Sequence, residues 1–230
     1  MWTLALTCAF FLGIHLMISG TPLKERVIAV IGGIAWYIVF SVLSLIGLIA
    51  MSVAFAIALN NQDNLNVVLW SAPLFLRVIA LFFNFIAFLL VVVGFLTPSP
   101  TNLYALHQLP EKPVYGIIRV SRHPILAGIG LWAMIHVICN GNLAAWLFFG
   151  TLFAQCALGA INIDRKRLAL MGDVYASIKK RTSIIPFVAI IEGRTAFAPE
   201  ELGYARMFLA ASLFSVFTVL HEMLFVVRAL

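Results

Sequence analysis

The chain has 230 residues, of which 63% are hydrophobic and only 10% are charged. A soluble domain carries about 25% charged residues, so this composition excludes an ordinary soluble protein and predicts an integral membrane protein. The formal net charge is +6, but the basic residues flank apolar segments. They are interpreted as signals of membrane topology, and no nucleic-acid partner is expected. The three scattered cysteines form no CxxC spacing, which indicates neither a disulfide framework nor a thiolate metal site.

Six apolar segments predict an all-α fold, a polytopic membrane helix bundle with about six transmembrane helices in one domain over residues 1–230. The first segment has no basic leader and no clear cleavage motif, so we interpret it as a retained span and not as a signal peptide. Turn residues, prolines and charged patches separate the segments. The predicted spans are residues 2–19, 34–59, 74–96, 121–140, 143–161 and 207–227.

The basic residues divide unequally between the two sides of such a bundle. Thirteen of the 15 Lys and Arg residues fall on one side, and only Arg77 and Arg228 fall on the other. Because cytoplasmic loops carry the excess of basic residues, the long segment 163–204 is predicted to be cytoplasmic. Both termini are then expected on the opposite side of the membrane, in a multi-pass protein whose immediate partners are membrane lipids.

The fourth predicted span follows an Arg-His-Pro motif and ends at the turn pair Asn140-Gly141. We predict Ser121 as its N-cap, with Pro124 in the first turn, where the missing N–H has no partner to lose. From Ser121 to Asn140 the helix would be ~28 Å long, enough to cross a bilayer core. Gly141 is expected at positive φ, in a tight turn into the next span.

Two histidines lie inside predicted spans, where ionisable groups are costly and often mark a functional site. His15 is in the first span and His136 in the fourth, where Trp132 precedes it by one helical turn. A neutral histidine offers one nitrogen lone pair, and in an apolar bundle that lone pair commonly binds haem iron or another metal. The alternative is a histidine that hydrogen-bonds a backbone carbonyl within the helix packing. The residues alone leave both interpretations open.

The two histidines differ in depth when the helices are drawn straight. His15 lies ~6 Å from the cytoplasmic edge of its span, whereas His136 lies ~20 Å in from His123. Depth alone therefore pairs His15 with His123, and His136 with His221. A helix tilt of ~20° or a longer first helix would close part of this gap.

The order and spacing of several motifs resemble the NnrU family, which is tied to denitrification and nitric-oxide metabolism in bacteria. The motifs lie between about Phe10 and Gly193. They are Gly13-Ile14-His15, a second-span pattern with Gly32, Tyr37, Phe40 and Ser41, Arg122-His123-Pro124 with Gly128, Trp132 and His136, Asn140-Gly141, Asp164-Arg165, and Thr182-Ser183-Ile184-Ile185-Pro186-Phe187. The family resemblance implies that the membrane is the bacterial inner (plasma) membrane, which would place both termini in the periplasm.

The NnrU family is similar to the cis-ζ-carotene isomerase of plants and cyanobacteria, a membrane enzyme that holds haem b between two histidines. Carried over, those ligand positions fall on His15 and His136. We also predict Trp132, Arg122 and His123 as cofactor-binding residues, and the motifs name no catalytic residue. The resemblance implies haem-dependent cis–trans isomerisation of a polyene, with a hydrophobic polyene substrate, or else a role beside a denitrification enzyme.

A wider resemblance gives an alternative chemistry. The Arg-His-Pro motif, then Gly172-x-x-Tyr175 and Ile185-Pro186, resembles isoprenylcysteine carboxyl methyltransferases and phospholipid methyltransferases, which implies S-adenosylmethionine as the cofactor. Those enzymes usually carry paired glutamates before the Gly-x-x-Tyr segment, where this chain has Asp164-Arg165-Lys166-Arg167. That departure weakens the methyltransferase alternative. A cofactor-free membrane assembly factor is a further alternative, because every motif residue also has a structural interpretation.

Overall fold

The computed structural model describes residues 1–18, 21–60, 65–101 and 111–225. Within these ranges the regular elements are helices, and the β-pairing is limited to an isolated antiparallel bridge between Val68 and Asn142. The predicted all-α fold is confirmed.

The chain divides into two compact units, and each is described by itself. The first unit contains residues 1–73 and 133–159, and the second contains residues 74–132 and 160–230. Helices α6 (Pro124–Cys139) and α7 (Leu143–Arg181) each contribute residues to both units. The prediction that residues 1–230 form one domain stays a prediction.

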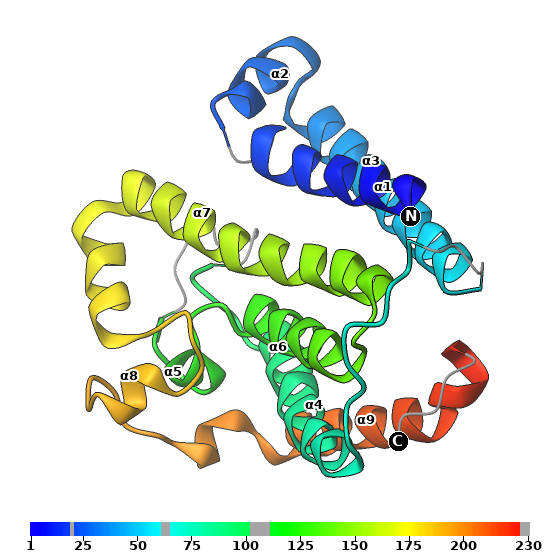
Figure 1. Cartoon of the computed structure of the whole chain (residues 1–230). Helices are drawn as coiled ribbons and strands as arrows, with labels where there is room; N and C mark the ends of the chain where they lie inside the picture. Colours follow the sequence, from blue (N-terminus) through cyan, green and yellow to red (C-terminus); the bar gives the residue numbers. More distant parts are fainter. Residues whose placement is uncertain (19–20, 61–64, 102–110, 226–230) are drawn as a thin grey trace. The chain divides into compact units, whose positions relative to one another are not determined.

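The first unit is built around the longest uninterrupted apolar helix, α3 (Gly33–Asn60), against which α1 (Trp2–Gly13) packs (Figure 1). α1 continues directly into a π-helical turn, η1 (Ile14–Ile18), and α2 (Leu23–Ile31) precedes α3. Polar residues are rare in α1 and α3, so the stability of these helices depends on apolar packing and on the internal hydrogen bonds that a membrane helix requires.

Both α1 and α3 contact the first turns of α7. Phe55 of α3 stacks on Phe148, with 4.6 Å between the ring centroids. The thiol of Cys8 on α1 lies 3.5 Å from the carbonyl oxygen of Leu147. These contacts fix the positions of α1 and α3 relative to the start of α7.

The second unit contains a pair of apolar helices, α4 (Leu74–Phe95) and α9 (Tyr204–Phe225), which lie side by side (Figure 1). The short helix α5 (Ile117–Val120) packs against α4 and against another short helix, α8 (Val188–Ile191), and the 3-10 helix η3 (Pro199–Leu202) leads into α9. The buried core between these elements consists of Leu90, Val93, Ile117, Ile118 and Val120.

Within the described residues each predicted span overlaps a helix, but not every one of these helices is long enough to cross a membrane. In the part of the chain that the structure describes, four helices, α3, α4, α7 and α9, meet that requirement by length and composition, and α1–η1 taken with α2 as one bent span makes five. α6 has 16 residues and is therefore ~24 Å long, short of a ~30 Å hydrocarbon core. The count of six crossings stays a prediction.

The fourth span is shorter than expected because Ser121 does not cap it. α6 begins at Pro124, and its first intrahelical bond runs from Ala127 N–H to the carbonyl of His123 at 2.8 Å. The hydroxyl of Ser121 instead donates to the carbonyl of Ile184 at 2.7 Å and accepts from the backbone N–H of His123 at 3.2 Å. Proline at the first helical position is confirmed, and the serine N-cap is wrong.

Gly141 makes the turn between α6 and α7, but for a different reason from the predicted one. Its φ is not among the positive values of the described residues. A Cβ atom at this position would overlap the carbonyl oxygen of Trp70. The carbonyl of Gly141 accepts the N–H of Leu69 at 2.6 Å, and the carbonyl of Val67 accepts the N–H of Leu143 at 3.0 Å. Glycine is required here because another backbone segment passes too close for a side chain.

We expect Gly141→Ala to lower the melting temperature of the purified protein in detergent. The added methyl group overlaps the Trp70 carbonyl, and overpacking of this kind costs about 1–3 kcal/mol. Gly150→Ala on α7 is the matched control, because a Cβ there meets no atom within 4 Å and alanine favours the helix. Equal melting temperatures for the two variants would contradict the close approach.

Candidate functional site

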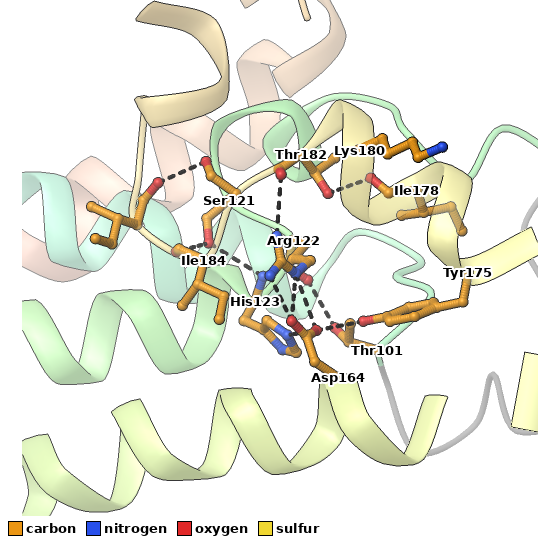
Figure 2. Close-up of polar contacts among 12 residues, drawn as sticks. Thr101, Ser121, Arg122, His123, Asp164, Tyr175, Ile178, Lys180, Thr182 and Ile184 are labelled. Carbon is orange, nitrogen blue, oxygen red and sulfur yellow. Dashed lines mark hydrogen bonds and ion pairs between the residues drawn. The ribbon is translucent and has the colours of Figure 1, made fainter. Parts of the chain in front are cut away.

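Three side chains of the second unit converge on the buried carboxylate of Asp164 (Figure 2). Arg122 reaches it twice, with Nε 3.0 Å from each carboxylate oxygen and a terminal nitrogen 2.5 Å from Oδ2. The Nε2 atom of His123 lies 2.7 Å from Oδ1, and the hydroxyl of Tyr175 donates to the same oxygen at 2.7 Å. A buried carboxylate is tolerated only when it is paired and hydrogen-bonded, and this one has both kinds of partner.

A break in α7 brings Tyr175 back to Asp164. The two residues are eleven positions apart, which in a straight helix would separate them by ~16 Å along the axis. Gly172 lies between them with φ 52° and ψ −128°, so the chain turns there, as the yellow bend of α7 shows in Figure 1. No atom lies within 4 Å of a Cβ built on Gly172, so glycine is required by the backbone conformation and not by space. This geometry explains the Gly-x-x-Tyr spacing seen in the sequence.

Backbone carbonyls of the segment that follows α7 hold the Arg122 corner in place. The backbone N–H of Arg122 donates to the carbonyl of Ser183 at 2.9 Å, and a guanidinium nitrogen donates to the carbonyl of Thr182 at 3.1 Å. The backbone N–H of Phe187 donates to the carbonyl of Val120 at 2.9 Å. The motif from Thr182 to Phe187, noted in the sequence without an assigned role, is therefore the backbone partner of the segment that enters α6.

Burial and the neighbouring carboxylate act in opposite directions on the pKa of His123. Burial lowers the pKa of His123 below its ordinary value, although the hydrogen bond and the charge of Asp164 oppose that change. Because the carboxylate only accepts, Nε2 of His123 carries a hydrogen and donates it to Oδ1 of Asp164. Asp164 balances the charge of Arg122 at the same time. The cluster positions the start of α6 against both legs of α7, and the predicted cofactor-binding role of Arg122 and His123 stays a prediction.

A second ion pair, which the sequence analysis did not identify, ties α5 to η3. Arg119 Nε donates to Glu201 Oε2 at 2.7 Å, a terminal nitrogen donates to Oε1 at 2.9 Å, and the N–H of Gly116 also donates to Oε2 at 2.7 Å. The hydrogen bond from Arg119 holds the pKa of Glu201 below its usual value, against the opposing effect of burial. The partners are 82 residues apart, and no local spacing signals such a pair.

His15 lies in the π-helical turn η1, an irregularity that often occurs at functional sites. Its Nδ1 lies 2.8 Å from the carbonyl oxygen of Phe11. A carbonyl only accepts, so Nδ1 carries the hydrogen and the lone pair is on Nε2. The ring packs against Phe11 and against Phe40 of α3, with centroid distances of 4.4 and 5.2 Å.

His136 packs near the other end of α3. Its ring lies 4.7 Å from that of Phe149, which in turn lies 5.6 Å from Phe55. Phe40, beside His15, and Phe55 are fifteen positions apart on one continuous helix, a separation of ~22 Å along its axis. The two histidines belong to the same compact unit, yet the structure does not bring them together.

The residues present do not fit one haem held between His15 and His136, since both axial ligands must reach the same iron. Nor does α6 offer a slot beside Gly128, because a Cβ there would lie 2.7 Å from the carbonyl oxygen of Ala87 on α4. The small residue is part of a close helix–helix seam. In the part of the chain that the structure describes, no group of three or more His, Cys, Asp or Glu residues is placed to hold a metal. Haem b and its two ligands stay a prediction, and no chemical step is assigned to it.

Comparison with known proteins settles the family. The sequence pattern of the NnrU protein family matches residues 3–229. The chain belongs to the NnrU family. It is also 38% identical over 122 residues to a protein named 15-cis-zeta-carotene isomerase, chloroplastic, from Arabidopsis thaliana, a match that covers 51% of this chain and 32% of the relative.

The protein of the same name from Zea mays is 36% identical over 117 residues, which cover 49% of this chain and 31% of that relative. The matched region is thus about a third of each relative's length. No solved structure matches the chain. The predicted NnrU resemblance is confirmed, together with its similarity to this group of isomerases.

We expect Asp164→Asn to destabilise the protein strongly. The substitution leaves the guanidinium of Arg122 buried without its counter-charge, and breaking a buried ion pair from one side costs about 3–5 kcal/mol. Asp173→Asn is the matched control, since Asp173 is exposed on the second leg of the same helix. Thermal unfolding in detergent should show a large loss for Asp164→Asn and little change for the control. A small loss for both would mean that the cluster does not hold the fold.

The separation of His15 from His136 leads to a spectroscopic prediction. With His15 beside Phe40 and His136 near Phe55, at most one of the substitutions His15→Ala and His136→Ala should change the absorption and low-temperature paramagnetic resonance spectra of a haem-containing preparation. Haem content per protein is measured alongside by pyridine haemochrome. A low-spin wild-type signal that both single variants convert to high spin would show that both histidines ligate one iron and that the helices rearrange to allow it.

Proposed function

We propose that this chain catalyses cis–trans isomerisation of an apolar polyene within the membrane, acting on a carotene of the 15-cis-zeta-carotene type. The observation that carries the proposal is the 38% identity over 122 residues to a plant protein named for that activity. Membership of the NnrU family over nearly the whole chain is consistent with it.

The physical setting agrees with such a substrate. A carotene is a hydrocarbon and dissolves in the bilayer core, so an enzyme that acts on it needs apolar surface at membrane depth. The exposed side chains of α3 and α4 supply such surface, and the largest include Ile34, Ile38, Phe75 and Phe82. Exposed apolar surface of this extent is normal where lipid is the solvent, and it lets a hydrocarbon reach the protein without crossing water.

Isomerisation leaves the atoms of the polyene unchanged, so the main requirement on the protein is to position the substrate. Rotation about a conjugated double bond neither adds nor removes an atom; it needs a transient loss of double-bond character and a polyene held in place. We assign no residue to that step. Haem b as a cofactor and a bacterial inner-membrane location are further proposals from the family resemblance. A role in denitrification rests on the resemblance alone, and the isomerase proposal does not require it.

The test is an isomerisation assay with the purified full chain in liposomes loaded with 15-cis-zeta-carotene. The reaction is kept in darkness, because light isomerises polyenes without an enzyme. Chromatography should show conversion of the 15-cis bond to trans at a rate at least about tenfold above empty liposomes. Parallel samples with and without a reductant show whether a redox-active group takes part.

The controls separate an inactive fold from a wrong assignment. Asp164→Asn liposomes should lose activity together with the cooperative unfolding transition, whereas Asp173→Asn should retain both. Wild-type protein that unfolds cooperatively yet gives no conversion above empty liposomes, with or without reductant and added haemin, would exclude the isomerase proposal.

A further inference from the structure

A cavity opens beside the Asp164 cluster in the second unit and has no assigned ligand. Its volume is about 360 Å³, and its lining consists of Arg122, Ile161, Asp164, Arg165, Leu168, Lys179 and Ile184. The proposed isomerase activity makes no use of it, since a carotene carries no charge and three cationic side chains line this space.

The charge of the cavity is not balanced from within the described structure. Asp164 is occupied by Arg122, with which it forms a buried ion pair. Arg165 and Lys179 also line the cavity, and neither takes part in an ion pair or side-chain hydrogen bond with another described residue. Two positive charges therefore remain, which favours an anionic ligand.

The bend at Gly172 is what places these two cations around one space. Arg165 lies on the first leg of α7 and Lys179 on the second, and in a straight helix they would be ~21 Å apart. The turn at Gly172, where φ is 52°, folds the second leg back toward the first. Both side chains then line the same cavity. Their convergence depends on the backbone turn that also returns Tyr175 to Asp164.

The remaining wall of the cavity is apolar and continues toward the membrane part of α7. Ile161 and Leu168 are seven positions apart, on one face of the helix, and they are 49% and 40% exposed. The last residue of the predicted fifth span is Ile161, so this apolar face leads from the cationic cavity toward the predicted membrane part of α7. A free phosphate needs no such wall, whereas a molecule with an anionic head and a hydrocarbon tail uses both parts.

We propose that this cavity binds the phosphate headgroup of an anionic membrane lipid, with Arg165 and Lys179 pairing with the phosphate and Ile161 and Leu168 lying along the start of its hydrocarbon chain. The shared chemistry is that of a phosphate group, and the chain-bearing lipid is the expected source. The proposal does not rest on the isomerase activity, and either can fail without the other.

The test measures binding to the full chain purified in detergent. Short-chain phosphatidic acid is titrated with short-chain phosphatidylcholine, inorganic phosphate and S-adenosylmethionine in parallel, and thermal shifts and native mass spectrometry record the bound species. Phosphatidic acid should bind in one-to-one stoichiometry and raise the melting temperature, and the zwitterionic lipid should not. Saturating S-adenosylmethionine that displaces the lipid would instead assign the cavity to the methyltransferase-type cofactor and overturn the proposal.

Matched charge variants locate the site. Arg165→Gln with Lys179→Gln should weaken phosphatidic acid binding about 30-fold, because each cation beside a phosphate contributes a factor of about five. Lys180→Gln with Arg181→Gln removes the same charge from neighbouring residues that do not line the cavity and should leave binding within about twofold. Equal weakening by both pairs would show a diffuse surface attraction and refute a defined site.

A further variant separates the two phosphate sources. Leu168→Ser should weaken binding of the lipid but leave binding of inorganic phosphate unchanged. If inorganic phosphate binds as tightly as phosphatidic acid and Leu168→Ser affects neither, the cavity is a free-phosphate site and the lipid assignment is wrong. All of these variants change half-buried or exposed side chains, and a cooperative melt of each confirms that it is folded.

Discussion

A carboxylate buried at the end of an apolar span must be neutralised and hydrogen-bonded, or the span cannot form around it. Asp164 imposes this requirement on the second unit. Its partners come from the residues that enter α6 and from the second leg of α7, so segments far apart in the chain must meet at one point. The carbonyls of Thr182 and Ser183 then fix the entry segment from outside. The buried charge of Asp164 thereby constrains where α6 begins and where the second leg of α7 lies.

The apolar segments were predictable because hydropathy reports a solvent preference that each residue carries by itself. The ends of these apolar segments were less predictable. Ser121 has the composition of an N-cap, yet its hydroxyl is used by the carbonyl of Ile184, a partner 63 positions away. Gly141 was correctly placed in a turn, but the constraint on it comes from the backbone of Trp70 and not from its own φ. In both cases a distant segment decides the local structure, and no window of sequence contains it.

The candidate site was also only partly predictable from the sequence. The NnrU resemblance selected Arg122 and His123, and the methyltransferase resemblance added Gly172 and Tyr175. The structure shows Arg122, His123 and Tyr175 converging on Asp164, with Gly172 making the turn. Residue spacing could not show that the motifs share one carboxylate. For His15 and His136, by contrast, residue counts within the predicted spans already showed a difference in depth. The structure retains that mismatch, with His15 and His136 near opposite ends of α3.

The bend at Gly172 couples the stability of the second unit to what occupies its cavity. It closes the hydrogen bond between Tyr175 and Asp164 and, by the same rotation, brings Lys179 toward Arg165. Two like charges gathered in this way repel one another, so the bent form carries an electrostatic cost that an anion in the cavity removes. A ligand that binds only the folded form stabilises it in proportion to the logarithm of its concentration over its dissociation constant. Anionic lipid is abundant in a bilayer and scarce in detergent, so the bend should be more stable in the membrane than in a micelle, with the cationic cavity as the cause of the difference.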